Sequence, residues 1–408
     1  MISIQTLRRL YFTFAMLVSA YVTGYMLIND DNMNDIGTQR VFLMRAIFCM
    51  VWVVCTFWYV KDIYLKPIST KENPYRMSII RRYIIYTIFT CISILVTNSE
   101  SIKEVLSAIK SFLCPCLIFL GSYVYTRRFG EQRNTLLLVI LLMGVCIYTY
   151  VSQYNLYNVL DVRGHFGTAY YPLYLLPIMF ASNKKWLRYV TLLVVAIVII
   201  SSLKRGGLVA LVLGISAYIM VEQYMKKKNT FVFRTTVLLI IVLVLCYIGI
   251  LYFGDTLIER FLNEDDTTGS GRTEIWASLF AHMNAQDLSS WLIGNGHLAT
   301  MRDSVYNRSA HNDFLEVIYN YGIPSFIAYM SFIIAILQYT LRAIRQGSKY
   351  ASSIAMLFTI YMVLSMVSII ILLHTATLVL LGLGVLIGWN EYELHQSNML
   401  ENEQTTSA

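Results

Sequence analysis

Charged side chains are scarce in this sequence, and that scarcity sets the first limit on its fold. Lys, Arg, Asp and Glu make up 14% of the 408 residues, whereas 57% are apolar. Soluble domains carry about 25% charged residues, so this chain has too little polar surface to be one. Only 6 prolines occur, and no low-complexity tract or short-period repeat is visible. The composition predicts a single integral membrane domain.

Paired cysteines and the common metal motifs are missing as well. No CxxC pair is present, and all 7 cysteines fall within apolar runs, where free thiols serve as small hydrophobic side chains. The sequence has no HExxH motif, no DxD-like pair on the predicted outer face, and no phosphate loop with Gly-Lys-Ser/Thr. We therefore expect neither a disulfide framework nor a metal or other cofactor.

Apolar runs that are long enough to cross a bilayer recur from end to end. A hydrocarbon core about 30 Å thick needs about 20 helical residues. The runs predict an all-α, polytopic membrane protein with about twelve transmembrane helices. The first run is too long for the core of a signal peptide and lacks a cleavage site, so we expect it to be retained. The spans are predicted at 10–28, 41–60, 83–97, 111–125, 134–152, 169–182, 187–203, 207–222, 235–254, 325–341, 350–372 and 375–390.

One long polar segment, residues 255–324, divides these spans. Nine predicted helices precede it in residues 1–254, three follow it in residues 325–390, and a tail occupies residues 391–408. Loops longer than about 12–15 residues are usually functional or disordered. Most of the 32 basic residues lie in short loops on the opposite side, and basic loops face the cytoplasm. Both termini are therefore predicted inside, and the long segment outside.

A tight basic turn joins the seventh and eighth predicted spans. It consists of Leu203-Lys204-Arg205-Gly206-Gly207, and the charge pattern places it on the outer side, against the usual bias. Both cations could simply snorkel to the interface. The interpretation we favour is an anion site, because the glycines allow close approach of a phosphate and a helix start adds N–H donors.

The long segment carries the candidate catalytic residues. Arg272 begins a stretch that predicts a helix, and Ser309 is a predicted N-cap for a second helix over 310–321, which Gly322-Ile323-Pro324 should end. His311, at the start of that helix, is a candidate base at neutral pH. Asp313 and Glu316 could orient the imidazole or could be solvated. The other candidate lining residues of the same cavity are Asn312, Arg163, His165 and His374.

Three motifs together resemble those of the O-antigen ligase and O-antigen polymerase family, over the whole chain. The first is the small-residue Arg-Gly turn, with Lys204 where the family often has Ser before the arginine. The second is an Arg…Trp…Gly-x-Gly segment, and the third is a histidine motif with Gly322 downstream. In this chain they are Ser201–Gly207, then Arg272, Trp276 and Gly294-Asn295-Gly296, then His311-Asn312.

The resemblance implies a membrane glycosyltransferase of a bacterial inner membrane with its active site in the periplasm. Its donor would be a glycan linked to undecaprenyl diphosphate, and its acceptor a second glycan or a lipid A-core. By motif, Arg205, Arg272 and the adjoining Lys204 would bind the diphosphate, and His311 would act as the base, without a metal, a nucleotide sugar or a nucleic acid partner. Inversion at the anomeric carbon is expected.

Several alternatives stay open at this stage. A polymerase, a ligase and a protein-glycosylating enzyme differ in their acceptor, which one sequence does not reveal. Ser325, where ligases often have Gly, Thr or Tyr, leaves ligase and polymerase unseparated. Outside the enzyme class, the chain could be a lipid-linked oligosaccharide flippase or another transporter, although its spans hold almost no internal charge and no inverted repeat. A signalling or scaffold protein is a further alternative.

Overall fold

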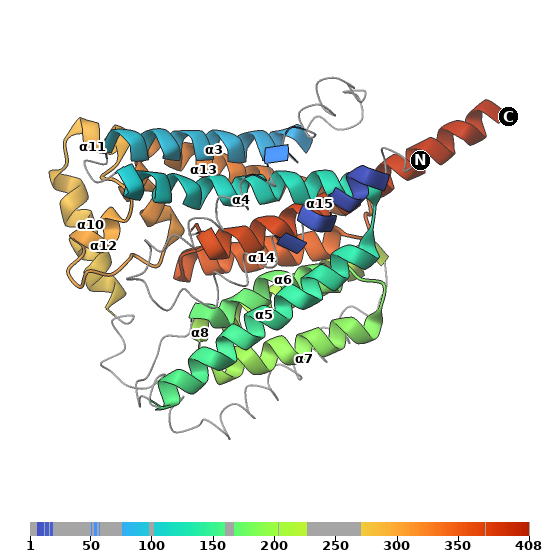
Figure 1. Cartoon of the computed structure of the whole chain (residues 1–408), viewed down its shortest axis with the longest axis horizontal. Helices are drawn as coiled ribbons and strands as arrows, with labels where there is room; N and C mark the ends of the chain where they lie inside the picture. Colours follow the sequence, from blue (N-terminus) through green and yellow to red (C-terminus); the bar gives the residue numbers. More distant parts are fainter. Residues whose placement is uncertain are drawn as a thin grey trace.

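The computed structural model of the chain is built of helices (Figure 1). It describes residues 76–97, 102–159, 167–202, 204–226, 271–371 and 373–407, with short stretches between residues 6 and 57. No strand occurs in these ranges. The elements are α3 (Arg76–Thr97), α4 (Ile102–Phe129), α5 (Gln132–Val159), the 3₁₀ helix η2 (Gly167–Tyr170), α6 (Tyr171–Phe180), α7 (Lys185–Ser201), α8 (Arg205–Lys226), α10 (Arg272–Ala285), α11 (Leu288–Ile293), α12 (Ala299–Asp303), α13 (Asp313–Arg345), α14 (Ala351–Val367) and α15 (Leu373–Ser407).

Six helices in the described ranges are long and apolar enough to cross a membrane, namely α3, α4, α5, α8, α13 and α15. They match six of the predicted spans and confirm an all-helical, multi-pass membrane protein. The helices α7 and α14 are apolar but have 17 residues each. The predicted spans 10–28, 41–60 and 235–254 fall largely or wholly outside the described residues.

The predicted span at 169–182 is wrong as a full crossing. The helix that forms there, α6, has 10 residues and contains two prolines, Pro172 and Pro177. At 1.5 Å per residue it is about 15 Å long, half of the hydrocarbon core. Proline removes backbone donors and limits helix length, so α6 is a short, buried helix inside the bundle.

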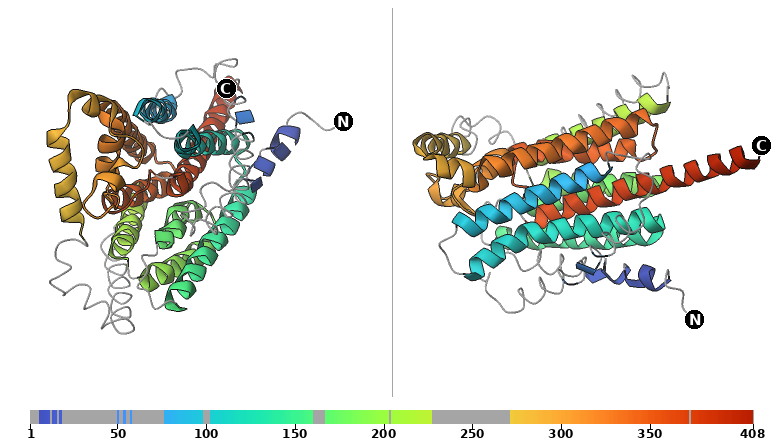
Figure 2. Two further views of the ribbon diagram at one scale, coloured as in Figure 1. Left: turned by 60° about the vertical axis from the view of Figure 1, so that its left-hand side comes forward. Right: turned by 90° about the horizontal axis from the view of Figure 1, so that it is seen from above.

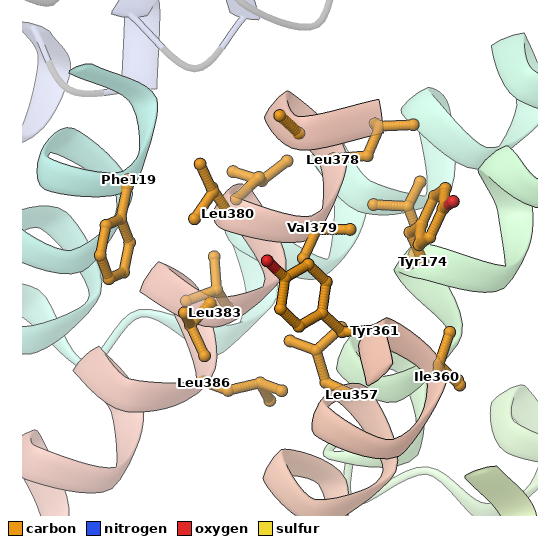
Figure 3. Packing of buried hydrophobic residues seen from close by; sticks show 14 of the residues in the cluster. Phe119, Tyr174, Leu357, Ile360, Tyr361, Leu378, Val379, Leu380, Leu383 and Leu386 are labelled. Carbon is orange, nitrogen blue, oxygen red and sulfur yellow. The ribbon is translucent and has the colours of Figure 1, made fainter. Parts of the chain in front are cut away.

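The helix α15 lies at the centre of the bundle. Its apolar side chains contact α4, α6 and α14 (Figure 3), and 89% of the residues in its most apolar stretch are buried. Gly384 and Gly388 face Ser122 and Thr126 of α4, and a Cβ on either glycine would overlap these side chains. Small residues four apart on both helices let the two backbones approach closely, as is typical of helix pairs in membranes. Beyond the bundle, α15 continues as a helix through most of the predicted tail (Figure 1).

Large apolar side chains also cover the outside of the bundle. Ile88, Ile92 and Leu95 of α3 are 49–60% exposed, and Leu141 of α5 is 58% exposed. In water such a surface would be unfavourable, whereas hydrocarbon solvates it. Of the seven cysteines, Cys91, Cys114, Cys116 and Cys146 lie in the described ranges, and none of these four forms a disulfide.

The basic helix ends gather at one end of the bundle. Arg127 and Arg128 end α4, and Arg342 and Arg345 end α13. These two ends lie close together, because the helices that follow them are in contact. Gln132 at the start of α5 donates to the hydroxyl of Tyr350, the residue before α14, at 2.5 Å. The helix α8 runs antiparallel to α14, so its final Lys226 points to the same end.

The opposite end carries a cap formed by α10, α11, α12 and the first turns of α13 (Figures 1 and 2). Its small core contains Ile275, Leu279, Ala310 and Tyr319, with Trp276 and Trp291 packed against it. The short helices expected within residues 255–324 are therefore present from residue 271 onward. The cap rests on the bundle, because the Ser93 hydroxyl of α3 donates to the Ile293 carbonyl at 2.5 Å.

The helix α13 begins later than predicted and breaks where predicted. Its N-cap is Asn312, whose side chain accepts from the Leu315 N–H at 3.1 Å, so the predicted cap at Ser309 and helix start at 310 are wrong. Gly322 has φ 77° and interrupts the helix just before Pro324. The residues of α13 before Gly322 belong to the cap, and those after Gly322 run through the bundle.

Candidate active site

The basic turn opens α8 at the cap end of the bundle. Arg205 is the first helical residue and is exposed, while Lys204 before it is half-buried. The two glycines make room for other side chains of the protein, whereas the sequence suggested that they make room for a phosphate. A Cβ on Gly206 would lie 2.8 Å from Cγ2 of Val367, and a Cβ on Gly207 would lie 2.9 Å from Cε1 of Tyr170. Glycine is required here because other side chains occupy the space next to the turn.

Arg272, the first residue of α10, lies close to the basic turn. Burial lowers the pKa of its guanidinium, and the positive charge of Arg205 lowers it further, while the phenol of Tyr170 acts in the opposite direction. Burial also raises the pKa of Tyr170, with Arg272 opposing. An arginine stays charged despite such shifts. The two predicted diphosphate ligands therefore lie near each other, and Tyr170 lies near both.

Trp276 connects Arg272 to the histidine segment. Residues four apart share one face of a helix, so Trp276 lies one turn along α10 from Arg272. Its indole N–H donates to the Ala310 carbonyl at 2.8 Å. His311 is the next residue, so this hydrogen bond holds the segment of His311 against α10, one turn from Arg272.

His311 precedes the N-cap and has a left-handed backbone, with φ 51°. Non-glycine residues seldom adopt this conformation unless their surroundings impose it. The half-buried imidazole lines a cavity of about 180 Å³. The polar lining residues are Asn307, Arg308, Ser309, Glu316 and Asn320, and Ile369 and Ile371 form part of the apolar wall.

Glu316 holds the segment that contains His311 in place through hydrogen bonds. It is 2% exposed and accepts hydrogen bonds from the Ala310 N–H at 2.6 Å, the Asn320 amide at 3.0 Å and the Thr300 hydroxyl. Of the two alternatives left open for Glu316, solvation is wrong, since the carboxylate is buried and stable only with such partners. Glu316 fixes the backbone beside His311, so it belongs to the cavity as a lining and supporting residue.

Asp313 joins the histidine segment to the turn between α14 and α15. It is fully buried, and its carboxylate accepts from the N–H groups of Ile370 at 2.8 Å and Ile371 at 3.3 Å. The Tyr329 hydroxyl donates to its other oxygen at 3.3 Å, and the Tyr361 hydroxyl donates to Tyr329 at 2.8 Å. Solvation is therefore wrong for Asp313 as well.

The segment 367–371 connects the two halves of the site. At one end Val367 contacts Gly206, next to Arg205. At the other end Ile369 and Ile371 line the His311 cavity. Four residue steps span at most about 14 Å. Arg205 and His311, more than a hundred residues apart in the sequence, are thus attached to one short piece of chain.

The Gly-x-Gly turn supports the break in α13. Pro324 has no N–H, and the break at Gly322 leaves the carbonyls of Tyr319 and Asn320 without helical donors. The N–H groups of Asn295 and Gly296 replace them, each at 3.0 Å. A Cβ on Gly322 would lie 2.5 Å from the Leu292 carbonyl oxygen, so the two backbones are in direct contact.

A second histidine, His297, follows this turn. Its Nδ1 lies 2.7 Å from the Tyr321 hydroxyl, and its ring packs against Phe112 of α4. Burial lowers the pKa of His297 to about 4. It is therefore neutral near pH 7, and its contacts indicate a structural role between cap and bundle.

The remaining predicted lining residues lie in different parts of the chain. Asn312 uses its side chain as the helix cap. His374 follows the first residue of α15, three residues past Ile371. Arg163 and His165 lie outside the described residues. Within the described ranges, no three His, Cys, Asp or Glu side chains are grouped as a metal site requires.

Two residues of this arrangement, Tyr170 and Val367, were absent from the sequence-based site. Both contact the paired glycines of the basic turn. Two adjacent glycines at a helix start do signal a close neighbour, but they do not say which residue it is. The contact joins positions that only the folded chain brings together.

Comparison with known families finds one similarity. The model of the O-antigen ligase family matches residues 190–330. The match runs from α7 to the middle of α13, and it contains Arg205, Arg272 and His311. Among curated proteins, none matches the chain by sequence.

Proposed function

Since residues 190–330 match the model of the O-antigen ligase family, we propose that this membrane protein transfers a glycan from an undecaprenyl-diphosphate carrier to a sugar acceptor. The observation that carries the proposal is the proximity of Arg205 to Arg272, and of Arg272, through Trp276, to the segment of His311. Paired guanidinium groups suit a diphosphate, and an imidazole suits a hydroxyl that must lose its proton.

The donor would bind with its diphosphate at the mouth of the bundle and its polyprenyl tail in the bilayer. Guanidinium groups present planar, paired N–H donors that match phosphate oxygens. The N-terminus of α8, where Arg205 stands, adds the positive end of a helix dipole. These features support binding of the lipid headgroup beside the basic turn.

The chemical step is a direct displacement at the anomeric carbon. The acceptor hydroxyl oxygen attacks that carbon while His311 takes its proton, and the bond from the carbon to the diphosphate oxygen breaks. The electron pair stays on the departing diphosphate, where Arg205 and Arg272 stabilise the growing negative charge. General base catalysis of this kind contributes about 10²–10⁴-fold. One displacement inverts the anomeric configuration, and no step requires a metal.

The orientation follows from the distribution of charge. The basic ends of α4, α8 and α13 gather away from the cap, and basic segments remain in the cytoplasm. We therefore place the cap, the basic turn and His311 on the periplasmic side of a bacterial inner membrane, with both termini in the cytoplasm. Lipid-linked glycans would reach the site from the outer leaflet.

Transfer by the purified protein in detergent tests this proposal. The wild-type protein should join a glycan to an acceptor and release undecaprenyl diphosphate, also in excess chelator. NMR of the product should show the anomeric configuration inverted relative to the donor. A transporter would give no product in detergent, where no compartments exist, so absence of transfer would contradict the proposal.

The acceptor is decided by a second experiment. Deletion of the gene followed by gel analysis of surface glycans separates the enzymes. Loss of long chains with one repeat unit still attached to the core would identify a polymerase. Lipid-linked polymer that accumulates beside bare core would identify a ligase.

A further inference from the structure

Tyr170 lies where the two arginine-bearing helices approach each other. It ends η2, is 7% exposed, and packs against the first turn of α8. Its hydroxyl oxygen lies 3.4 Å from the position that a Cβ on Gly206 would take, and its Cε1 lies 2.9 Å from that of Gly207. The phenol thus lies directly beside the helix residue that follows Arg205.

Arg272 approaches the same phenol from the cap. The Tyr170 phenol raises the pKa of Arg272, and Arg272 in turn lowers the pKa of Tyr170, whereas the positive charge of Arg205 lowers the pKa of Arg272. The side chains of Tyr170, Arg205 and Arg272, from η2, α8 and α10, thus lie near one another. A phenol hydroxyl donates one hydrogen bond at neutral pH, and it supplies this donor without a further charge.

We infer that the Tyr170 hydroxyl donates a hydrogen bond to the diphosphate of the lipid-linked donor, between Arg205 and Arg272. This inference rests on the proposed function and makes Tyr170 a third binding residue for the leaving group. The diphosphate gains charge as the glycosidic bond breaks, so the hydrogen bond strengthens towards the transition state. Burial of the phenol disfavours the phenolate, which keeps the donor hydrogen in place.

A purely structural role for Tyr170 would involve the ring alone. The ring fills the space above Gly206 and Gly207, and a phenylalanine would fill it equally well. Tyr170→Phe therefore removes the hydroxyl and retains the packing. Tyr174→Phe is the matched control, because Tyr174 lies one turn along, is fully buried, and has a hydroxyl without a hydrogen-bond partner in the described part of the chain.

The experiment measures kcat/KM for the lipid-linked donor and inhibition by inorganic pyrophosphate, in purified wild type and both variants. Tyr170→Phe should lower kcat/KM about 10- to 100-fold, the range for a hydrogen bond to a charged group, and should weaken inhibition by pyrophosphate. Its melting temperature and the KM for the acceptor should match those of the wild type, and Tyr174→Phe should resemble the wild type in every measurement.

Wild-type donor kinetics and pyrophosphate inhibition in Tyr170→Phe would overturn the inference while leaving the proposed function intact. Equal losses in Tyr170→Phe and Tyr174→Phe would also overturn it, because the effect would then come from packing. A wild-type protein that releases no undecaprenyl diphosphate would overturn both the inference and the proposed function.

Discussion

Replacement of Asp313 by alanine should loosen the connection between the His311 segment and the turn that follows α14. The Asp313 carboxylate accepts from the N–H groups of Ile370 and Ile371 and from the Tyr329 hydroxyl. Alanine leaves these three buried donors without an acceptor. Ile371 also forms part of the wall of the His311 cavity, so both stability and transfer should suffer.

The size of the effect follows from those contacts. A buried donor without a partner costs about 1–3 kcal/mol, so three of them cost roughly 3–9 kcal/mol if the turn does not rearrange. Folded proteins are stable by only about 5–15 kcal/mol. Asp313→Asn keeps one oxygen for the two N–H groups, and its amide can donate to Tyr329. We expect Asn to cost much less than Ala.

The assay compares thermal unfolding in detergent with the rate of glycan transfer, in wild type, Asp313→Ala and Asp313→Asn. Alanine should lower the melting temperature and the transfer rate together, and asparagine should restore most of both. Because the segment 367–371 also touches Gly206, the KM for the donor should rise in the alanine variant. A wild-type melting temperature and rate in Asp313→Ala would refute this reasoning.

Two further predictions follow from the arginine site and from the cap. Arg205→Lys should lower kcat/KM for the donor at least about tenfold, because a lysine cannot reproduce the paired donors of a guanidinium; steady-state kinetics that match the wild type would exclude a diphosphate contact. The lowered pKa of His297 predicts that its contribution to stability is complete above its unfolded pKa of about 6.5 and is lost as the pH falls towards about 4. Melting temperatures measured across this range should fall less steeply in His297→Gln, and equal slopes would show that His297 is not responsible.

Local chemistry predicted part of the cap and missed another part. The break at Gly322 was predictable because Pro324 lacks an N–H and disfavours helix in the residue before it. The start of the helix α13 was not predictable, since Ser309 and Asn312 are both residues that favour the N-cap position. Tertiary contacts decide between them, because the Ala310 N–H is taken by Glu316 and the Ala310 carbonyl by Trp276.

The helices of the bundle were likewise predicted correctly in part and wrongly in part. Hydropathy placed the six long helices correctly, but it also predicted a span at 169–182. The prolines Pro172 and Pro177 were a visible warning there, and the apolar character of α6 reflects burial inside the protein. Gly384 and Gly388, four residues apart, likewise signalled a close helix contact, although their partner α4 could be found only in the folded structure.

The candidate residues could be named from the sequence, but their arrangement in space could not. Arg205, Arg272 and His311 stood out as polar groups in an apolar chain. Their connections run through Trp276, Tyr170 and the segment 367–371, and each is a contact between distant positions. No spacing rule in one sequence contains such contacts.

The most direct test of the account is the activity of His311→Ala, purified in detergent and supplied with an undecaprenyl-diphosphate-linked glycan and an acceptor. This variant should keep the melting temperature and donor affinity of the wild type, because Arg205 and Arg272 are intact, and it should transfer no glycan above background. Transfer by His311→Ala at a rate near that of the wild type would contradict the assignment of His311 as the base.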